Sequence, residues 1–339
     1  MSERILIVAP SWVGDAILSE PLVAVLREPL EEPIVDVLAP PWCAPIYRRM
    51  RGIRNVVESP LAHRELGLRK RRAIAVSLRE QAYTRAFVLP NSFKSALIPW
   101  LARIPRRIGY VGEARGMILT DVRRLDRKAY PRLVDRFVAL AAGPGEILPT
   151  ASAPLLVPNS ANAAEAMRSL GLATRRPVAI FCPGAEYGPA KRWPTEHFAT
   201  LARRLIDSGY TVWLIGSSND RVAADPIAAQ VPEIRNACGR TDLGTAIDLL
   251  ATARVVVSND SGLMHAAAAV GVPLVGLFGS SSPEYTPPLS PLARVARIDI
   301  VCSPCFQREC PLGHFKCMRD LSPSTVYDLA RLGVNQDLP

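Results

Sequence analysis

Residues 255–265 have the sequence VVVSNDSGLMH. The valines predict a buried strand, the small polar residues after them predict a turn, and a helix is predicted over Gly262–Val270. A strand that enters a helix through a short turn is the repeating unit of a parallel sheet, because parallel strands need a crossover connection and a helix usually supplies it. The stretch therefore predicts an α/β fold.

The rest of the chain repeats this alternation. Strands are predicted at Arg4–Ala9, Ile34–Leu38, Arg85–Leu89, Val178–Phe181, Thr211–Ile215, Arg254–Ser258 and Leu274–Phe278. Further helices are predicted at Asp15–Arg27, Thr195–Ser208 and Asp242–Ala251. Apolar strands that alternate with helical segments indicate parallel sheets covered by helices.

Two domains are expected from the length of the chain. Its 339 residues exceed the size at which one hydrophobic core usually keeps growing. The segment 142–162 is rich in glycine and proline, as interdomain connections are, so we expect domains over residues 1–155 and 156–339. Two doubly wound, Rossmann-like domains would face each other across a central cleft, with the functional residues just after the strands.

Composition limits the location and the partners of the protein. No apolar run approaches the roughly 20 residues of a membrane-spanning helix and no signal peptide is evident, so a cytosolic protein is expected. A formal net charge of +10 favours an acidic partner: nucleic acid, an anionic membrane surface or a phosphorylated substrate. Aromatic residues are only 6% of the chain and no nucleic-acid-binding motif is present, so we expect no nucleic-acid partner.

Basic residues cluster mainly in the first half of the chain, at Arg64, Arg69–Arg72, Arg103–Arg107 and Arg123–Lys128. The run Arg69–Arg72 predicts the start of a solvated helix. These clusters either form a functional positive face or only keep the surface soluble.

Asp15 ends the sequence PSWVGD after the first predicted strand, with Gly14 expected in the turn and Asp15 at the start of a helix. Aspartate is a favoured N-cap residue, so capping is one interpretation. A general base that faces the cleft is the other. A single glycine does not supply the G-x-G-x-x-G spacing of a dinucleotide-binding turn, which counts against a nicotinamide enzyme.

The turn before the helix at 262–270 is a candidate phosphate site. Backbone N–H groups from Ser261 and Gly262 onward are expected at the positive end of that helix, where anions bind readily. His265 lies four residues after Ser261 and therefore on the same helix face. The alternative makes Asp260 a helix cap and His265 a packed core residue.

Residues 182–194, CPGAEYGPAKRWP, follow the first strand of the second half. Glycines such as Gly184 let a backbone approach a ligand closely, and Lys191 and Arg192 offer positive charge to a diphosphate. The spacing of a P-loop is absent. A surface loop with incidental charges is the alternative.

In the first half, residues 89–97, LPNSFKSAL, also follow a buried strand and open a helix. The side chains of Asn91, Ser92 and Lys94 could bind sugar hydroxyls or a phosphate, or the stretch could be a capping turn. The spacing does not decide between the two.

Cys302, Cys305, Cys310 and Cys317 form the pattern C-x2-C-x4-C-x6-C, with His314 nearby. Closely spaced thiolates suit tetrahedral zinc, and a cytosolic setting disfavours disulfides. A second C-x2-C pair is missing from the pattern. A structural zinc ion is therefore a hypothesis for this segment.

PSWVGD, LPNSFKSAL, CPGAEYGPAKRWP and NDSGLMH together resemble the motifs of the bacterial ADP-heptose:lipopolysaccharide heptosyltransferase family, over nearly the whole chain. They are more similar to type II than to type I members. The resemblance implies a glycosyltransferase of GT-B architecture that inverts the anomeric carbon of ADP-L-glycero-β-D-manno-heptose. It implies an acceptor that is the first heptose of the phosphorylated inner core on lipid A, and thus peripheral attachment to the anionic inner face of the cytoplasmic membrane.

The resemblance also implies roles for individual residues. Asp15 would be the general base, and Lys191 would stabilise charge on the departing ADP. The implied donor-binding residues are Gly184, Lys191, Asp260, Ser261, Gly262 and His265, and the candidate acceptor-binding residues are Asn91, Ser92 and Lys94. No DxD motif is evident, so no obligatory metal cofactor is expected. Another family member, which adds a heptose or hexose to a different core acceptor, is the alternative.

Overall fold

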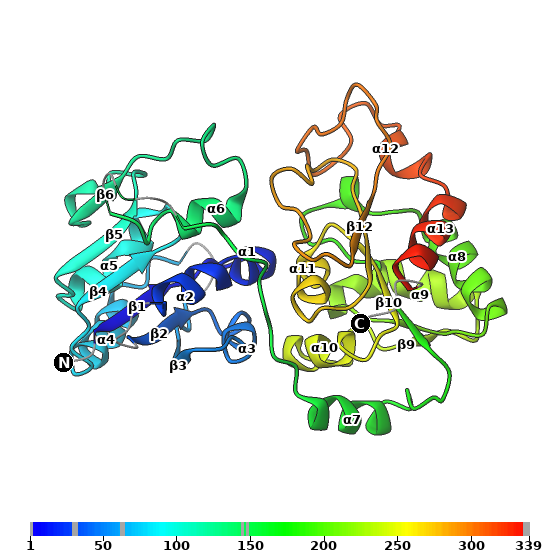
Figure 1. Ribbon diagram of the computed structural model, residues 1–339, viewed down its shortest axis with the longest axis horizontal. Helices are drawn as coiled ribbons and strands as arrows, with labels where there is room; N and C mark the ends of the chain where they lie inside the picture. The colour runs from blue at the N-terminus through cyan, green and yellow to red at the C-terminus, as the bar shows by residue number, and fades with distance from the viewer. Residues whose placement is uncertain (1–2, 29–32, 62–64, 144–145, 147–148, 335–339) are drawn as a thin grey trace. The chain divides into compact units, whose positions relative to one another are not determined.

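The computed structural model describes residues 3–28, 33–61, 65–143, 146 and 149–334. The chain forms two compact units, Met1–Leu155 and Leu156–Pro339 (Figure 1). Residues 144–145 and 147–148 of the glycine- and proline-rich connection lie outside the described residues.

The first unit is a six-stranded parallel sheet with the strand order β3-β2-β1-β4-β5-β6. Its strands are β1 (Arg4–Val8), β2 (Ile34–Ala39), β3 (Ile53–Glu58), β4 (Arg85–Val88), β5 (Arg106–Tyr110) and β6 (Asp121–Arg123). Its helices are α1 (Val13–Leu18), α2 (Glu20–Leu26), α3 (Ala44–Tyr47), α4 (Leu68–Arg79), α5 (Phe93–Leu101), the 3-10 helix η1 (Arg115–Met117) and α6 (Leu133–Val138).

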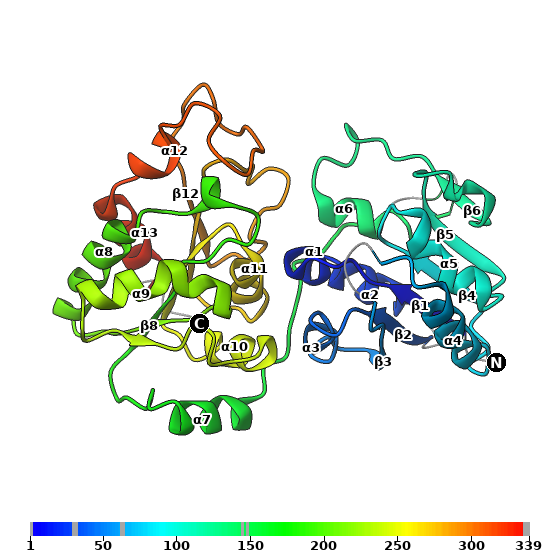
Figure 2. The ribbon, with the colours of Figure 1, turned by 180° about the vertical axis from the view of Figure 1, so that it is seen from behind.

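The second unit is also a six-stranded parallel sheet, with the order β12-β11-β10-β7-β8-β9. Its strands are β7 (Val178–Cys182), β8 (Thr211–Leu214), β9 (Arg235–Asn236), β10 (Val255–Asn259), β11 (Leu274–Leu277) and β12 (Ala293–Ala296). Its helices are α7 (Ser160–Ser169), η2 (Pro189–Lys191), α8 (Thr195–Asp207), η3 (Ser218–Asp220), α9 (Arg221–Gln230), α10 (Leu243–Leu250), α11 (Gly262–Ala269), α12 (Lys316–Arg319) and α13 (Pro323–Val334), several of which Figure 2 shows from behind.

The two sheets have the same topology, and this positions the candidate residues. Within each unit the strand order reverses once, between β1 and β4 in the first and between β7 and β10 in the second. Loops at the carboxyl ends of the strands beside such a reversal are where doubly wound sheets bind ligands. The prediction of two doubly wound α/β units is therefore confirmed, and all four candidate stretches follow one of these four strands.

Apolar side chains that cover both faces of the central strands form the core. Every residue of β7 and β10 is buried, as the sequence pattern predicts for strands inside a parallel sheet. In the second unit, Phe181, Trp193 and Phe198 pack edge-on or tilted against one another at the centre. Each large apolar side chain buried in this way contributes about 1.5–3 kcal/mol to folding.

The predicted helix over Asp15–Arg27 is wrong in two respects. The helix begins earlier, at Val13, so that Gly14 lies inside its first turn, and it is broken at Ser19 into α1 and α2. Pro21 explains the break, because its ring has no N–H and collides with the carbonyl four residues earlier in a continuous helix.

Glu20, the first residue of α2, is buried. Its Oε2 accepts a hydrogen bond of 3.2 Å from the backbone N–H of Leu155, the last residue of the first unit. Burial raises the pKa of Glu20 to about 7, and the hydrogen bond from Leu155 lowers it in part.

The basic run Arg69–Arg72 lies in α4, but its interpretation as a solvated helix start is wrong for one residue. Arg71 is only 5% exposed, and its guanidinium donates to the backbone carbonyls of Leu66, Lys94 and Glu65. Arginine suits this role because its planar group presents five donors. Part of the positive charge of the first unit is therefore buried and does not lie on its surface.

None of the helices in the described ranges combines the length and the apolar character needed to cross a bilayer.

Candidate functional site

The loop after β7 is tied to the end of β10 by one buried side chain. Asn259 donates from Nδ2 to the carbonyl oxygen of Pro183 (2.7 Å) and accepts at Oδ1 from the backbone N–H of Trp193 (3.1 Å). Its side chain is fully buried. Buried amides that satisfy both groups fix the backbone they bind. Asn259 therefore holds both ends of the loop 183–193, a function that the sequence analysis missed.

This loop carries Lys191 to Asp260, which follows β10. Lys191 Nζ lies 2.5 Å from Asp260 Oδ2, and the two side chains are 17% and 4% exposed. Ser281 Oγ, from the loop after β11, donates to the same carboxylate oxygen at 2.5 Å. The ring of Tyr187 lies 5.0 Å from the Lys191 ammonium, within cation–π range. The cluster thus brings together residues that follow β7, β10 and β11, three strands of one sheet.

Asp260 does not cap the helix that follows, so that half of the alternative is wrong, whereas its other half, a packed His265, agrees with the burial of this side chain. The N-cap of α11 is Ser261, whose side chain makes no capping hydrogen bond. Ser261 and Gly262 are partly exposed at the start of this helix. A helix start beside a lysine is suited to an anion, because backbone N–H groups and the helix dipole both favour negative charge.

His265 lies in the second turn of α11 and is 5% exposed. Burial lowers its pKa to about 4, with Lys191 lowering it further and Asp260 raising it in part. The imidazole is therefore neutral near pH 7. Its Nδ1 is buried and has no hydrogen-bond partner among the described residues. His265 can offer a hydrogen bond to a ligand, but not a positive charge.

Gly184 allows a neighbouring loop of the protein to approach its backbone closely. A Cβ at this position would lie 1.9 Å from Oδ1 of Asp220. The Asp220 carboxylate in turn accepts hydrogen bonds of 2.8 Å from the backbone N–H and the hydroxyl of Ser217. Gly184 thus lets the loops after β7 and β8 meet.

In the first unit, Asp15 is the third residue of α1. The N-cap is Trp12, so the interpretation of Asp15 as a cap is wrong. Its charge adds to burial in raising the pKa of Cys43 to about 12, and it also raises the pKa of Tyr47. Asp15 therefore lies near both side chains, and it is itself partly exposed. A carboxylate in this setting can accept a proton from a substrate hydroxyl.

The second stretch of the first unit, after β4, is held by residues from the loop after β5. Asn91 Oδ1 accepts a hydrogen bond of 3.0 Å from Arg115, which is fully buried. Ser92 is the N-cap of α5 but makes no side-chain capping bond, and Glu113 Oε2 instead accepts from the N–H of Phe93 at 2.9 Å. The capping turn, one of the two alternatives for this stretch, is thus capped from another loop, and Ser92 and Lys94 are partly exposed beside it.

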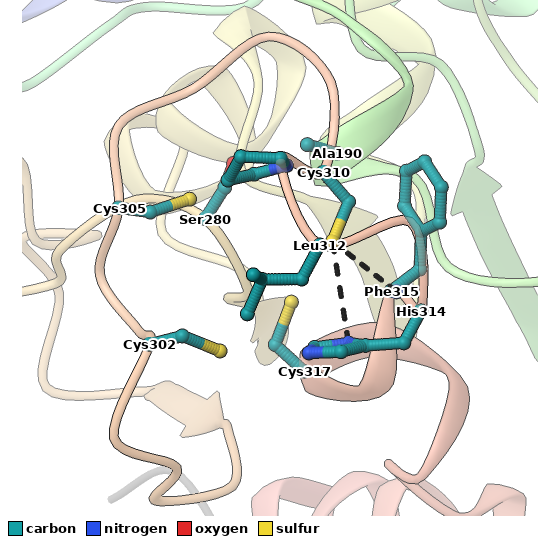
Figure 3. Close-up of a pocket in the computed structure, with 10 residues that line it drawn as sticks. Ala190, Ser280, Cys302, Cys305, Cys310, Leu312, His314, Phe315 and Cys317 are labelled. Atoms are coloured by element: carbon teal, nitrogen blue, oxygen red, sulfur yellow. Dashed lines mark hydrogen bonds between the residues drawn. The ribbon is translucent and has the colours of Figure 1, made fainter.

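All four clustered cysteines are free thiols and, with His314, line one pocket (Figure 3). Within the ranges that the structure describes, no three His, Cys, Asp or Glu side chains are placed to hold a metal ion as they stand. The zinc hypothesis stays a prediction.

Comparisons with known proteins give a consistent result. Residues 71–316 match the model of the family described as glycosyltransferase family 9 (heptosyltransferase). The chain is 44% identical to lipopolysaccharide heptosyltransferase 2 of Escherichia coli, over 96% of this chain and 97% of that one. It is 45% identical to lipooligosaccharide heptosyltransferase 2 of Haemophilus influenzae, over 87% and 88% of the two chains.

Solved structures agree with this result. The structure of E. coli ADP-heptose LPS heptosyltransferase II is 41% identical, covers 98% of this chain and 99% of its own, and has a TM-score of 0.89. A glycosyltransferase family 9 structure from Veillonella parvula is 21% identical with a TM-score of 0.85, over 98% and 97% of the chains, which extends the likeness of the fold.

Proposed function

This chain belongs to glycosyltransferase family 9, the heptosyltransferases, and we propose that it transfers L-glycero-D-manno-heptose from ADP-heptose to the first heptose of the lipopolysaccharide inner core. Relatives more than 40% identical over nearly the whole chain are named lipopolysaccharide heptosyltransferase 2 and ADP-heptose LPS heptosyltransferase II, which supports the proposal. The observation in the chain itself that carries the proposal is the pairing of Lys191 and Asp260 beside the start of α11.

The donor diphosphate would bind between Lys191 and the start of α11. Lys191 supplies the positive charge, and the backbone at Ser261 and Gly262 supplies N–H groups. Asp260 holds the ammonium before the donor arrives, and Ser281 holds Asp260. Neutral His265 donates a hydrogen bond to the donor without adding a charge that would have to be desolvated.

The reaction replaces one C–O bond at the anomeric carbon with another on the opposite face. Asp15 takes the proton of the acceptor hydroxyl as its oxygen attacks, and the bond to ADP breaks with its electron pair on the phosphate oxygen. The developing charge on ADP is stabilised by Lys191 and the helix start, because preformed positive groups act most strongly where charge appears. Configuration at the anomeric carbon is thereby inverted.

These groups would make a catalytic metal unnecessary. One lysine and one helix dipole would compensate the negative charge of the leaving diphosphate, and GT-B enzymes can use such groups in place of a divalent ion. We therefore propose transfer that persists in a chelator. Complete loss of activity that magnesium restores would contradict this part of the proposal.

The acceptor would bind to the first unit and keep the enzyme at the inner face of the cytoplasmic membrane. Asn91, Ser92 and Lys94 are the candidate sugar and phosphate ligands beside α5. Exposed basic residues Arg124, Arg127 and Lys128 follow β6 and would attract an anionic surface, at about 1 kcal/mol each near the lipid headgroups.

The decisive experiment is transfer from ADP-heptose to a lipid A acceptor that already carries one heptose, beside an acceptor that lacks it. The proposal expects transfer only to the first acceptor, and none with Asp15→Asn. Transfer only to the acceptor without heptose would assign a different acceptor to this chain.

A further inference from the structure

The segment 302–317 contains four thiols, of which Cys317 belongs to the hydrophobic core and the other three do not. Cys302, Cys305 and Cys310 are partly exposed and Cys317 is buried, yet all four line the same pocket (Figure 3). The other three cysteines of the chain, at positions 43, 182 and 238, are buried elsewhere. Cysteines in a core behave as small apolar residues, whereas partly exposed thiols that share a pocket are chemically available.

Hydrogen bonding and backbone conformation hold the segment around Cys310. The N–H of Phe315 donates to Cys310 Sγ at 3.4 Å, and His314 Nδ1 lies 4.0 Å from the same sulfur. Phe306 and Phe315 have φ of 54° and 50°, a left-handed conformation that costs a non-glycine residue about 1–2 kcal/mol. Backbone strain of this kind persists only where other interactions enforce it.

The four sulfurs supply the ligand set of a zinc site. Cys302, Cys305, Cys310 and Cys317 line one pocket, and four sulfur ligands in tetrahedral geometry are the preferred set of Zn²⁺. As they stand in the part of the chain described, no three of these side chains are at ligand distance, so binding must draw the sulfurs inward.

The same segment is bonded to both loops that build the Lys191–Asp260 cluster. The loop after β11 accepts two hydrogen bonds from the segment, at the two residues that precede Ser281. Phe306 N donates to Ser280 O (2.7 Å), and Ser303 Oγ donates to Gly279 O (2.7 Å). A Cβ on Gly279 would lie 3.2 Å from Cys317 Sγ, so this thiol touches the loop as well.

On the side of β7, the segment is bonded to the residues that precede Lys191. Ala190 N donates to Arg308 O at 3.0 Å, and the hydroxyl of Tyr187 donates to Phe306 O at 2.6 Å. The guanidinium of Arg308 lies 5.3 Å from the Tyr187 ring, whose other neighbour is Lys191. Movement of the segment would therefore be transmitted to both partners of the ion pair.

We propose that Cys302, Cys305, Cys310 and Cys317 together bind one Zn²⁺ ion, which fixes the segment 302–317 against the loops that carry Lys191 and Ser281. The ion takes no part in bond making. The existence of the site is independent of the proposed function, whereas its effect on donor binding rests on it.

The first test is metal analysis with thiol titration on the full-length protein, purified without chelator. We expect about one zinc per chain, with the four clustered thiols slow to react until zinc is removed. Cys305→Ser and Cys310→Ser should each lose the zinc, and Cys238→Ala, which changes a thiol elsewhere in the same unit, should keep it. Less than about a tenth of a metal ion per chain, with four fast thiols, would overturn the site. One iron in place of zinc would overturn the choice of metal.

The second test is the affinity for ADP, measured by calorimetry on folded protein with and without zinc. Outer supports of a binding site typically change affinity about 10- to 100-fold, and we expect about a tenfold loss that Zn²⁺ restores and Mg²⁺ does not. Circular dichroism identifies a variant that has unfolded. Equal ADP affinity in the zinc-free and zinc-bound protein would overturn the coupling. Failure of heptosyl transfer with intact zinc and ADP binding would instead overturn the proposed function.

Discussion

Lys191 Nζ and Asp260 Oδ2 are 2.5 Å apart although 69 residues separate them in the chain. The contact joins the strand ends on the two sides of the reversal in the second sheet, β7 and β10. The aspartate thus compensates the charge of an ammonium group that is nearly buried.

Replacement of Lys191 by alanine should lower kcat by about 100- to 1,000-fold, because it removes the charge that would stabilise the leaving ADP in the proposed reaction. Steady-state transfer assays measure this loss. Arg175→Ala, which removes a positive charge at an exposed position of the same unit, should leave kcat unchanged. A Lys191→Ala enzyme with normal kcat and only a raised KM would show that the lysine binds the donor but does not act on the transition state.

Replacement of Asp15 by asparagine should lower kcat about 100- to 10,000-fold, since the amide cannot accept the proton of the acceptor hydroxyl. ADP affinity should not change, because the proposed donor ligands all belong to the second unit. Asp126→Asn serves as the control, as its carboxylate only accepts backbone N–H bonds in an exposed turn. Normal transfer by the Asp15 variant would remove it from the reaction.

His265 should make the protein less stable in acid. Its pKa is lowered to about 4 in the folded state, from 6.5, so the folded protein binds the proton more weakly than the unfolded chain does. The contribution of His265 to the free energy of unfolding is complete above pH 6.5. It is lost as the pH falls towards 4, and the loss amounts to at most about 3 kcal/mol. Urea unfolding at several pH values should show a smaller acid loss in His265→Gln than in the unmodified chain. Identical slopes would contradict the burial of a neutral imidazole.

Glu20 should act in the opposite direction. Its pKa is raised to about 7 from 4.5, so the folded state prefers the protonated carboxyl. The contribution of the protonated carboxyl to the free energy of unfolding is complete below pH 4.5. It falls by up to about 3 kcal/mol as the pH rises towards 7. Glu20→Gln keeps an oxygen that can accept from Leu155 N and cannot ionise. The variant should gain stability relative to the unmodified chain between pH 5 and pH 8, and no such gain would show that solvent reaches the carboxylate.

The α/β class and the positions of the central strands could be predicted because their signal is local. Residues such as Val255–Val257 are apolar without interruption, and the turns and helices after them carry their own residue preferences. The strands β3, β5, β6, β9 and β12 were not predicted. Strands β6 and β9 are only two or three residues long, and β3, β5 and β12 contain exposed or partly exposed residues that interrupt the apolar pattern. The local signal for the break between α1 and α2 is Pro21.

The contacts within the sites could not be predicted in the same way. Ser281 meets Asp260 from 21 residues away and Glu113 meets Phe93 from 20, and no local spacing specifies such pairs. The sequence analysis placed Asp260, Ser261 and His265 at one turn, but the neutral state of His265 follows from burial, which only the packed structure reveals. The catalytic and binding roles themselves stay predictions, as does a cleft between the two domains.

The side chain of Asn259 holds both ends of the loop 183–193: its amide N–H donates one hydrogen bond and its amide oxygen accepts another. Aspartate has nearly the same shape, but it would set a carboxylate oxygen against the carbonyl oxygen of Pro183 and lose the bond. Deamidation, the ordinary chemical ageing of asparagine, makes this replacement without any mutation. A chain deamidated at position 259 would therefore lose the hydrogen bond that holds the start of the loop 183–193 to the end of β10.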